Sequence, residues 1–182
     1  MKKAIGLIEL KSIPIGIQTA DEMLKAANVE LILANPICPG KYMILISGDV
    51  GAVNNSIKTG INMADIFLVE SHVINNVHED VLVAVSGVSD VKDIKSIGAI
   101  ETISALTAIK AADIAVKSSN IKLIEVRIAK GLGGKGFLIM TGEVSSIKSA
   151  VKSCENELGK MGEITSTAVI PSPHRNLIES LV

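Results

Sequence analysis

The chain repeats itself, and this internal repeat constrains its fold more than any other feature of the sequence. The run AIGLIE at residues 4–9 matches SIGAIE at residues 96–101, which lies 92 residues further on. At the same spacing, Ala20-Asp21, Lys25 and Asn28 recur as Ala112-Asp113, Lys117 and Asn120. This self-similarity predicts two tandem copies of one structural unit. We place the first domain at residues 1–90 and the second at 94–182, joined by a stretch rich in Gly, Ser, Asp and Lys.

Each copy has the hydrophobic pattern of a βαββαβ unit. In the first copy we expect strands at Ala4–Leu10, Val29–Ala34, Tyr42–Ile46 and within residues 67–74, with helices from Pro14 to about Ala27 and after Asp49. In the second copy we expect strands at Ile97–Ile103, Ile121–Ala129, Phe137–Thr141 and Ile164–Ile170, with helices at Ala105–Ser118 and Ser146–Leu158. The prediction is therefore an α/β (α+β) protein made of two tandem ferredoxin-like domains.

Several side chains have an expected place in these elements. Asp49 is expected to cap the second helix, and Asp21 to pair with Lys25 one turn along the first helix. The second helix should bury one stripe of side chains, namely Val53, Ile57, Ile61 and Ala64. Cys154 shares the corresponding stripe of the second copy with Ile147, Val151 and Leu158, which predicts a small core residue.

Composition limits the class of function. The chain is 48% hydrophobic with a mean hydropathy of +0.45, yet no uncharged apolar run approaches the roughly 20 residues that span a bilayer. The surplus apolar surface therefore predicts burial between subunits and not in a membrane. A net charge of −1 and an aromatic content of 2% argue against nucleic-acid binding. Two cysteines and no signal-peptide pattern favour the cytosol.

The segment Asn35–Lys41 reads NPICPGK and predicts a stiff, solvent-facing turn that displays the thiol of Cys38. Taken alone, one exposed thiol is more often incidental than a metal ligand. The matching loop of the second copy, residues 130–136, reads KGLGGKG and has no cysteine. It lacks the Ser or Thr and the following helix of a phosphate-binding loop, so we expect a flexible rim or a bend.

The remaining polar residues do not assemble an active site. Three histidines, at 72, 78 and 174, cannot form a His–carboxylate–nucleophile set in this order, so the chain is predicted not to be an enzyme. Glu9 and Glu101 recur in both copies after a strand glycine, and we expect them to satisfy nearby backbone or interface groups. For His72 we expect a structural or exposed place.

The repeated pattern resembles that of bacterial microcompartment shell proteins. It consists of Gly-x-Ile/Leu-Glu, Ala-Asp-x-x-x-Lys-x-x-Asn, a glycine-bearing loop, Gly-Asp/Glu-Val and a terminal Pro-x-Pro-His, and it covers nearly the whole chain. Two fused copies resemble the tandem-domain, trimer-forming class. The Cys38 loop is similar to that of iron–sulfur-binding T-type shell proteins of propanediol-utilisation microcompartments.

The resemblance implies a flat homotrimer with pseudo-sixfold symmetry and a central pore, tiling edge to edge with other shell proteins in the microcompartment shell. It places Ile37, Pro39 and Gly40 at the pore. It implies edge contacts by a larger set: Lys25, Asn28, His78, Lys117, Asn120, His174 and Arg175. Encapsulated redox enzymes are further implied partners, and neither nucleic acid nor a membrane is expected.

One thiolate per chain cannot hold a [4Fe-4S] cluster, which normally takes four cysteines. A threefold axis brings three copies of Cys38 together, and these would bind three irons of one cluster per trimer. The leading hypothesis is a structural shell trimer with a pore-bound cluster for electron transfer or cluster exchange. Two alternatives stay open: a shell protein whose pore conducts a small polar metabolite without a cluster, and a ferredoxin-like small-molecule sensor.

Overall fold

A computed structural model describes residues 4–87, 91, 93–128 and 131–181. Its contacts divide the chain into two compact units, Met1–Val77 and His78–Val182. The predicted join, near Ser86–Lys95, falls partly on residues 88–90 and 92, which lie outside the described part. None of the described helices combines the length and the apolar character needed to cross a membrane.

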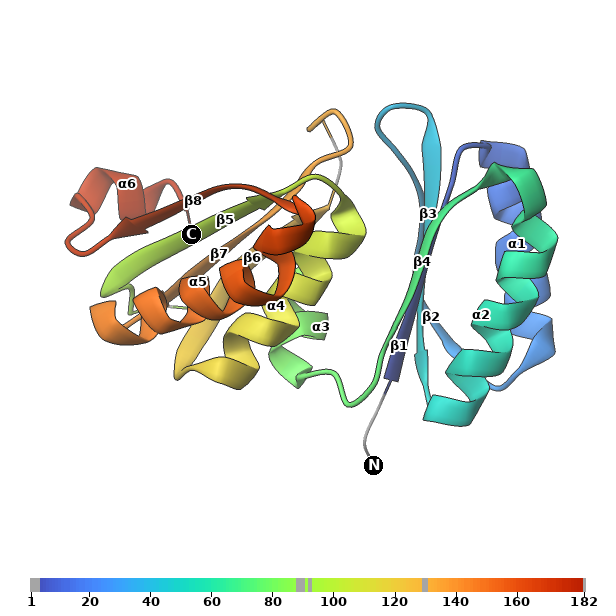
Figure 1. The fold of residues 1–182 in the computed structure, drawn as a ribbon, viewed down its shortest axis with the longest axis horizontal. Coiled ribbons are helices and arrows are strands. Elements are labelled where there is room, and N and C mark those ends of the chain that lie inside the picture. Colours follow the sequence, from blue (N-terminus) through green and yellow to red (C-terminus); the bar gives the residue numbers. More distant parts are fainter. Residues whose placement is uncertain (1–3, 88–90, 92, 129–130, 182) are drawn as a thin grey trace. The chain divides into compact units, whose positions relative to one another are not determined.

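Unit 1 is an antiparallel four-stranded sheet with two helices on one face (Figure 1). The strands follow the order β2-β3-β1-β4 across the sheet. The elements along the chain are β1 (Ala4–Leu10), α1 (Ile13–Ala26), β2 (Glu30–Ile37), β3 (Lys41–Gly48), α2 (Val50–Ala64), the 3-10 turn η1 (Asp65–Phe67) and β4 (Leu68–Ile74). The predicted βαββαβ order is confirmed in this copy.

Unit 2 repeats this architecture with the sheet order β6-β7-β5-β8. Its repeated elements are β5 (Ser96–Thr102), α4 (Ala105–Ser118), β6 (Ile121–Ile128), β7 (Gly136–Gly142), α5 (Val144–Leu158), the 3-10 turn η2 (Gly159–Met161) and β8 (Ile164–Ile170). Two short helices were not predicted: α3 (Glu79–Val85) precedes this sheet and α6 (Arg175–Glu179) follows it. Because α3 contacts α4 and β6, it belongs to unit 2 although it directly follows the first repeat.

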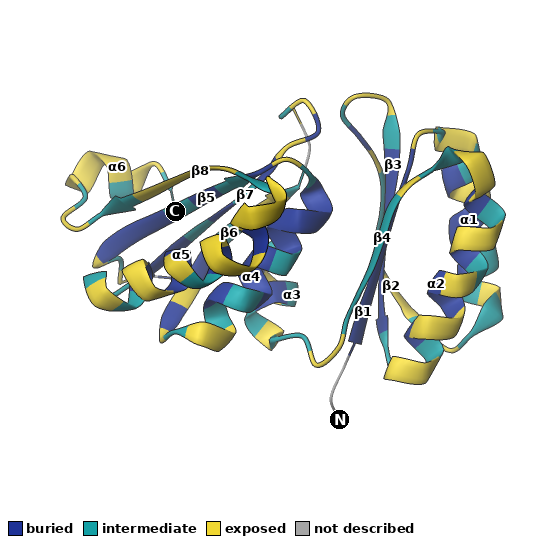
Figure 2. Ribbon diagram, in the orientation of Figure 1, coloured by how far each residue is buried: buried dark blue, intermediate teal, exposed yellow. Residues whose placement is uncertain are grey.

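The core of unit 1 lies between the sheet and its two helices (Figure 2). Ile8 and Leu10 of β1 pack there with Met23 of α1 and Ile44 of β3. Aliphatic side chains and methionine therefore form most of this core, as the low aromatic content predicts.

The predicted stripe on α2 is wrong at one position. Val53, Ile57 and Ala64 are buried, but Ile61 is 36% exposed. Gly60 is buried in its place, because at this position the helix approaches Met23 and Ile8 so closely that a Cβ atom would collide with both. Asp49 occupies the predicted N-cap position of α2, but its side chain makes no capping hydrogen bond.

The turn around Cys38 is shorter than predicted. β2 continues through Pro36 to Ile37, and Pro36 lies opposite Tyr42 of β3. A proline cannot donate to a sheet ladder, but β2 is an edge strand, where a missing N–H can face away from the sheet. The turn itself comprises Cys38, Pro39 and Gly40.

Candidate functional site

Cys38 stands in the three-residue turn between β2 and β3. Ile37 and Lys41 are the last paired residues on either side of it. Ile37 is 5% exposed, whereas the free thiol-bearing residue Cys38 is half-buried and Pro39 and Gly40 are exposed. Gly40 has φ +65°, and a Cβ there would have no neighbour within 4 Å, so the turn needs glycine for its backbone conformation and not for space. The turn is thus solvent-facing beside an anchored strand end, as the sequence predicts, but Cys38 itself is half-buried and not fully displayed.

A buried ion pair holds the base of this turn. Lys41, the first residue of β3, pairs with Glu9 of β1, whose side chain is fully buried. Glu9 lies directly opposite Glu70 of β4, and Glu70 pairs with His72 at 2.7 Å between Oε1 and Nε2. Glu9 is thus paired with a lysine side chain, where the sequence analysis expected a backbone or interface group, and His72 gains a partner that the sequence does not indicate.

The second copy repeats this anchor without the thiol. Lys135 Nζ lies 2.9 Å from Glu101 Oε1, and Thr165 donates a hydrogen bond of 2.5 Å to the same carboxylate. The Thr165 hydroxyl and then Lys135 lower the pKa of Glu101. The described part of this loop bends through Gly131, Gly133 and Gly134, all at positive φ, and β7 follows. A strand at this place agrees with a rim or bend and not with a phosphate-binding loop.

The donor set limits how a metal could be held. Within the described residues, no three His, Cys, Asp or Glu side chains of one chain come together as a metal site. Cys38 therefore fits an iron–sulfur cluster only where several chains each contribute one thiolate. Its turn is exposed and its thiol is free, so the residue is available for such a shared site.

Cys154 is a core residue, as predicted. It is fully buried on α5 with Ile147, Val151 and Leu158, and its Sγ donates to the carbonyl of Ala111 at 3.4 Å. Burial, with smaller contributions from two nearby glutamates, raises the pKa of this thiol to about 12. The thiolate, which is the reactive form, is therefore scarce at neutral pH.

We expect the two thiols to differ sharply in reactivity. At pH 8 the native apoprotein should release one equivalent of thionitrobenzoate from Ellman's reagent rapidly, from Cys38, while Cys154 reacts at least tenfold more slowly. Adding urea should make both thiols react at similar rates. The Cys38→Ser variant is the control and should lose the fast phase alone. Fast labelling of Cys154 in that variant would contradict its place in the core.

The residues predicted at the edge contacts lie on or near the surface of each unit. Lys25 pairs with Asp21 at 2.5 Å, and Lys117 pairs with Asp113 at the same distance. The ion pair with Asp21 raises the pKa of Lys25. The other predicted edge residues are exposed or half-buried: Asn28, Asn120, His78, His174 and Arg175. Their part in contacts between trimers stays a prediction.

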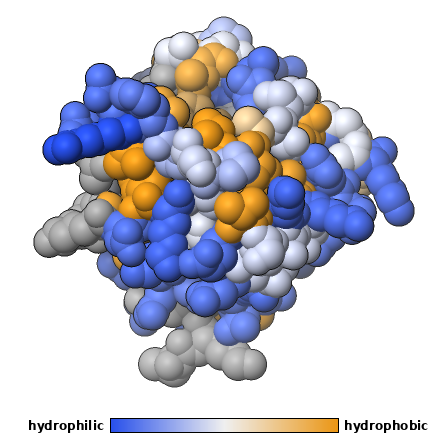
Figure 3. All heavy atoms as spheres, turned by 90° about the vertical axis from the view of Figure 1, so that its left-hand side faces the viewer, coloured by the Kyte–Doolittle hydropathy of each residue, from blue (hydrophilic) through white to orange (hydrophobic). Residues whose placement is uncertain are grey.

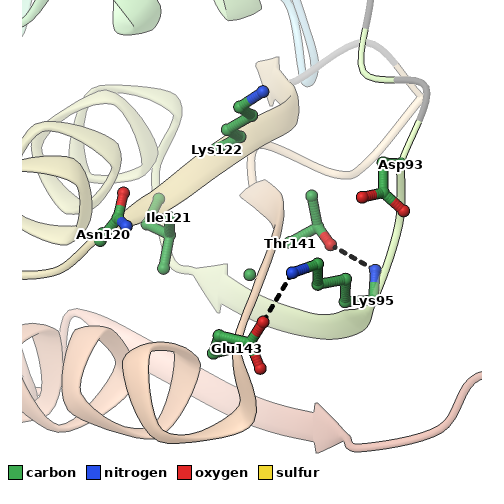
Figure 4. A pocket seen from close by; sticks show the side chains of 8 residues that line it. Asp93, Lys95, Asn120, Ile121, Lys122, Thr141 and Glu143 are labelled. Carbon is green, nitrogen blue, oxygen red and sulfur yellow. Dashed lines mark hydrogen bonds and ion pairs between the residues drawn. The ribbon is translucent and has the colours of Figure 1, made fainter.

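One cavity of unit 2, of about 290 Å³, lies at the start of α5 (Figure 4). Lys95 contacts two other residues that line this cavity. Its Nζ pairs with Glu143 at 2.7 Å, and its backbone N–H donates to Thr141 Oγ1 at 3.1 Å. The pairing with Glu143 raises the pKa of Lys95, so its charge is present but already neutralised. Beside these residues, the lining includes Asp93, Asn120, Ile121, Lys122 and Gly142.

Comparisons with known proteins identify the family. The BMC domain profile matches residues 4–77 and 96–173. The chain is 42% identical to the bacterial microcompartment shell protein PduT of Citrobacter freundii, over all of this chain and 99% of that protein. A crystal structure of a microcompartment protein from Desulfitobacterium hafniense DCB superposes with a TM-score of 0.94 at 44% identity, covering 98% of this chain and 99% of the other.

Single-domain relatives match half of the chain. The shell protein PduA of Citrobacter freundii is 36% identical over 84 residues, which is 44% of this chain and 88% of that protein. These relatives are structural proteins, in agreement with the prediction that the chain is not an enzyme. The chain belongs to the BMC domain family, as a tandem-domain shell protein of bacterial microcompartments.

Proposed function

We propose that three copies of this chain form a ring in the shell, and that their three Cys38 thiolates hold one [4Fe-4S] cluster at the central pore. The observation that carries the proposal is the free Cys38 thiol, presented at an exposed turn that a buried ion pair ties to the sheet. Three thiolates bind three irons and leave the fourth iron open to a small ligand or a partner. Such a cluster would serve electron transfer across the shell or cluster exchange with enzymes inside it.

The ligand set of the proposed site comes from the first copy alone. The loop of the second copy, residues 130–136, contains no cysteine, and the other cysteine of the chain, Cys154, is buried in the core. The ring therefore alternates between thiol-bearing and glycine-rich loops around its axis. This alternation gives three thiolates and not six, which suits one cubane cluster.

Iron and sulfide analysis of the protein purified without air tests the proposal. We expect about four irons and four sulfides per three chains, with absorbance near 400 nm. Cys38→Ser should reduce both to background and leave the oligomer intact. Cys154→Ala, the matched control, should keep the iron and lose a little stability. If the wild-type protein holds no iron after reconstitution but assembles unchanged, the cluster hypothesis is wrong. The alternative hypothesis, a pore that conducts a small polar metabolite, would then take its place.

A further inference from the structure

Lys41 is the charged residue nearest in sequence to the Cys38 thiol. Between Glu30 and Asp49 the chain holds no other acidic or basic residue. Ile37, the residue before Cys38, lies directly opposite Lys41 across the hairpin. Opposed Cα atoms lie about 5 Å apart and consecutive ones about 4 Å apart, which places the Cα atoms of Cys38 and Lys41 within about 9 Å of each other. A charge on Lys41 therefore acts on whatever the thiol binds.

Glu9 of β1 cancels the charge of Lys41 from a position that solvent does not reach. The side chain of Glu9 is fully buried, and its Oε1 pairs with Nζ of Lys41, whose side chain is 20% exposed. Glu70, which lies opposite Glu9 in the sheet, is paired with His72 at 2.7 Å. Dissolved salt screens buried charges far less than exposed ones. The field of Lys41 at the thiol turn thus depends on the charge of Glu9.

The second copy holds the same two residue types in a more solvated setting. Glu101 and Lys135 pair at 2.9 Å, but their side chains are 39% and 49% exposed. Thr165 of the edge strand β8 donates a hydrogen bond to Glu101, and the middle of that strand is exposed. Figure 3 views the side of unit 2 that carries α6, and hydrophilic side chains lie among apolar ones there. Solvent and salt therefore weaken the field of this second pair.

We infer, on the basis of the proposed function, that Glu9 lowers the electron affinity of the proposed cluster by cancelling the charge of Lys41 beside each thiolate ligand. Taking up one electron adds one negative charge to the site. An uncompensated lysine favours that charge, whereas a neutral ion pair does not. Three chains contribute the same pair to one cluster, so one substitution changes three charges. Glu9 acts through Lys41 and does not itself bind iron.

A redox titration of the Glu9→Gln variant, loaded with iron and sulfide without air, tests this role. Glutamine keeps the size of glutamate and still accepts a hydrogen bond from Lys41, so the iron content and the oligomer should be unchanged. Dye mediators supply or take up one electron per cluster, and electron paramagnetic resonance measures the reduced fraction. At the midpoint potential of the parent, the ratio of reduced to oxidised cluster should rise about tenfold, a shift of about 59 mV. Three unit charges at about 9 Å have this effect even at the dielectric constant of water.

Two further variants serve as controls, and circular dichroism should show that all of them are folded. Adding Lys41→Met to Glu9→Gln removes both charges, so the ratio should return to within about threefold of the parent. Glu101→Gln removes the same charge at the equivalent place of the second copy. It should shift the ratio by less than about threefold, because that pair is exposed.

Three results would overturn the role of Glu9. Equal shifts for Glu9→Gln and Glu101→Gln would show that burial of the first pair does not matter. A loaded Glu9→Gln variant with the ratio of the parent, or one that loses its iron while the double variant keeps it, would make the pair an anchor of the turn alone and leave the cluster standing. A parent without iron would overturn the proposed function and the role of Glu9 together.

Discussion

Replacing Lys41 with methionine is expected to lower the free energy of unfolding by about 3–5 kcal/mol, the range found when one partner of a buried ion pair is removed. The side chain of Glu9 is fully buried, and Lys41 is 20% exposed beside it. Glu9 Oε2 has no hydrogen-bond partner within the described residues, so the carboxylate depends on Lys41 for its neutralisation. Methionine keeps the aliphatic length but leaves the charge unpaired.

The neighbouring strand adds to this cost. Glu70 of β4 lies directly opposite Glu9, and like charges at opposed positions destabilise a sheet. Urea unfolding followed by circular dichroism measures the effect, with all variants at one protein concentration because assembly contributes to stability. Adding Glu9→Gln to Lys41→Met should recover most of the loss, since no unpaired charge then remains.

The second copy supplies the matched control. Lys135 and Glu101 form the corresponding pair, but their side chains are 49% and 39% exposed, and Ser166 stands opposite Glu101 in place of a carboxylate. Lys135→Met should therefore cost no more than about 1 kcal/mol, as exposed pairs do. Equal losses for Lys41→Met and Lys135→Met would show that burial and the opposed Glu70 do not govern the first pair.

The sequence predicts the parts of this fold that periodic patterns encode. The strand β1 and the helix α4 lie where apolar spacing places them, and the stripe that includes Cys154 is buried as expected. The sequence predicts that the strand ends at Ala34 and that Pro36 lies in the turn, because proline in a ladder is unfavourable; the structure keeps Pro36 in β2, where the edge tolerates it. Such a position depends on strand order, which a local pattern does not contain.

The helices α3 and α6 are not predicted from the sequence, for a different reason. Each is at most seven residues long, too short for a helical stripe to stand out. The signal that could have found them is the recurrence of His78 and His174, which the repeat alignment shows but which reads equally well as a surface motif. The Cys38 turn is visible in the sequence, whereas the convergence of three such turns depends on contacts between chains.

The second large effect on stability is expected at Gly16 of α1, which packs against Tyr42 of β3. A Cβ atom at Gly16 would lie 2.5–2.6 Å from the Cβ and ring atoms of Tyr42, and the Tyr42 hydroxyl donates to the carbonyl of Ala34 at 2.9 Å. The ring cannot turn away without losing this hydrogen bond. Gly16→Ala should therefore destabilise the protein by about 1–3 kcal/mol, as overpacking does, although alanine favours a helix.

In the second copy the glycine of this contact lies on the strand and not on the helix. Ala108 replaces Gly16 and Gly136 replaces Tyr42, and a Cβ at Gly136 would lie 2.7 Å from the Cβ of Ala108. In a Tyr42→Gly background, Gly16→Ala should consequently be neutral or stabilising, a coupling that a double-mutant cycle of urea midpoints measures. Gly51→Ala on α2, with no neighbour within 4 Å of the new atom, should stabilise by up to about 1 kcal/mol. If Gly16→Ala lowers the free energy of unfolding equally with and without the Tyr42 ring, the destabilisation arises in the helix backbone and not in this contact.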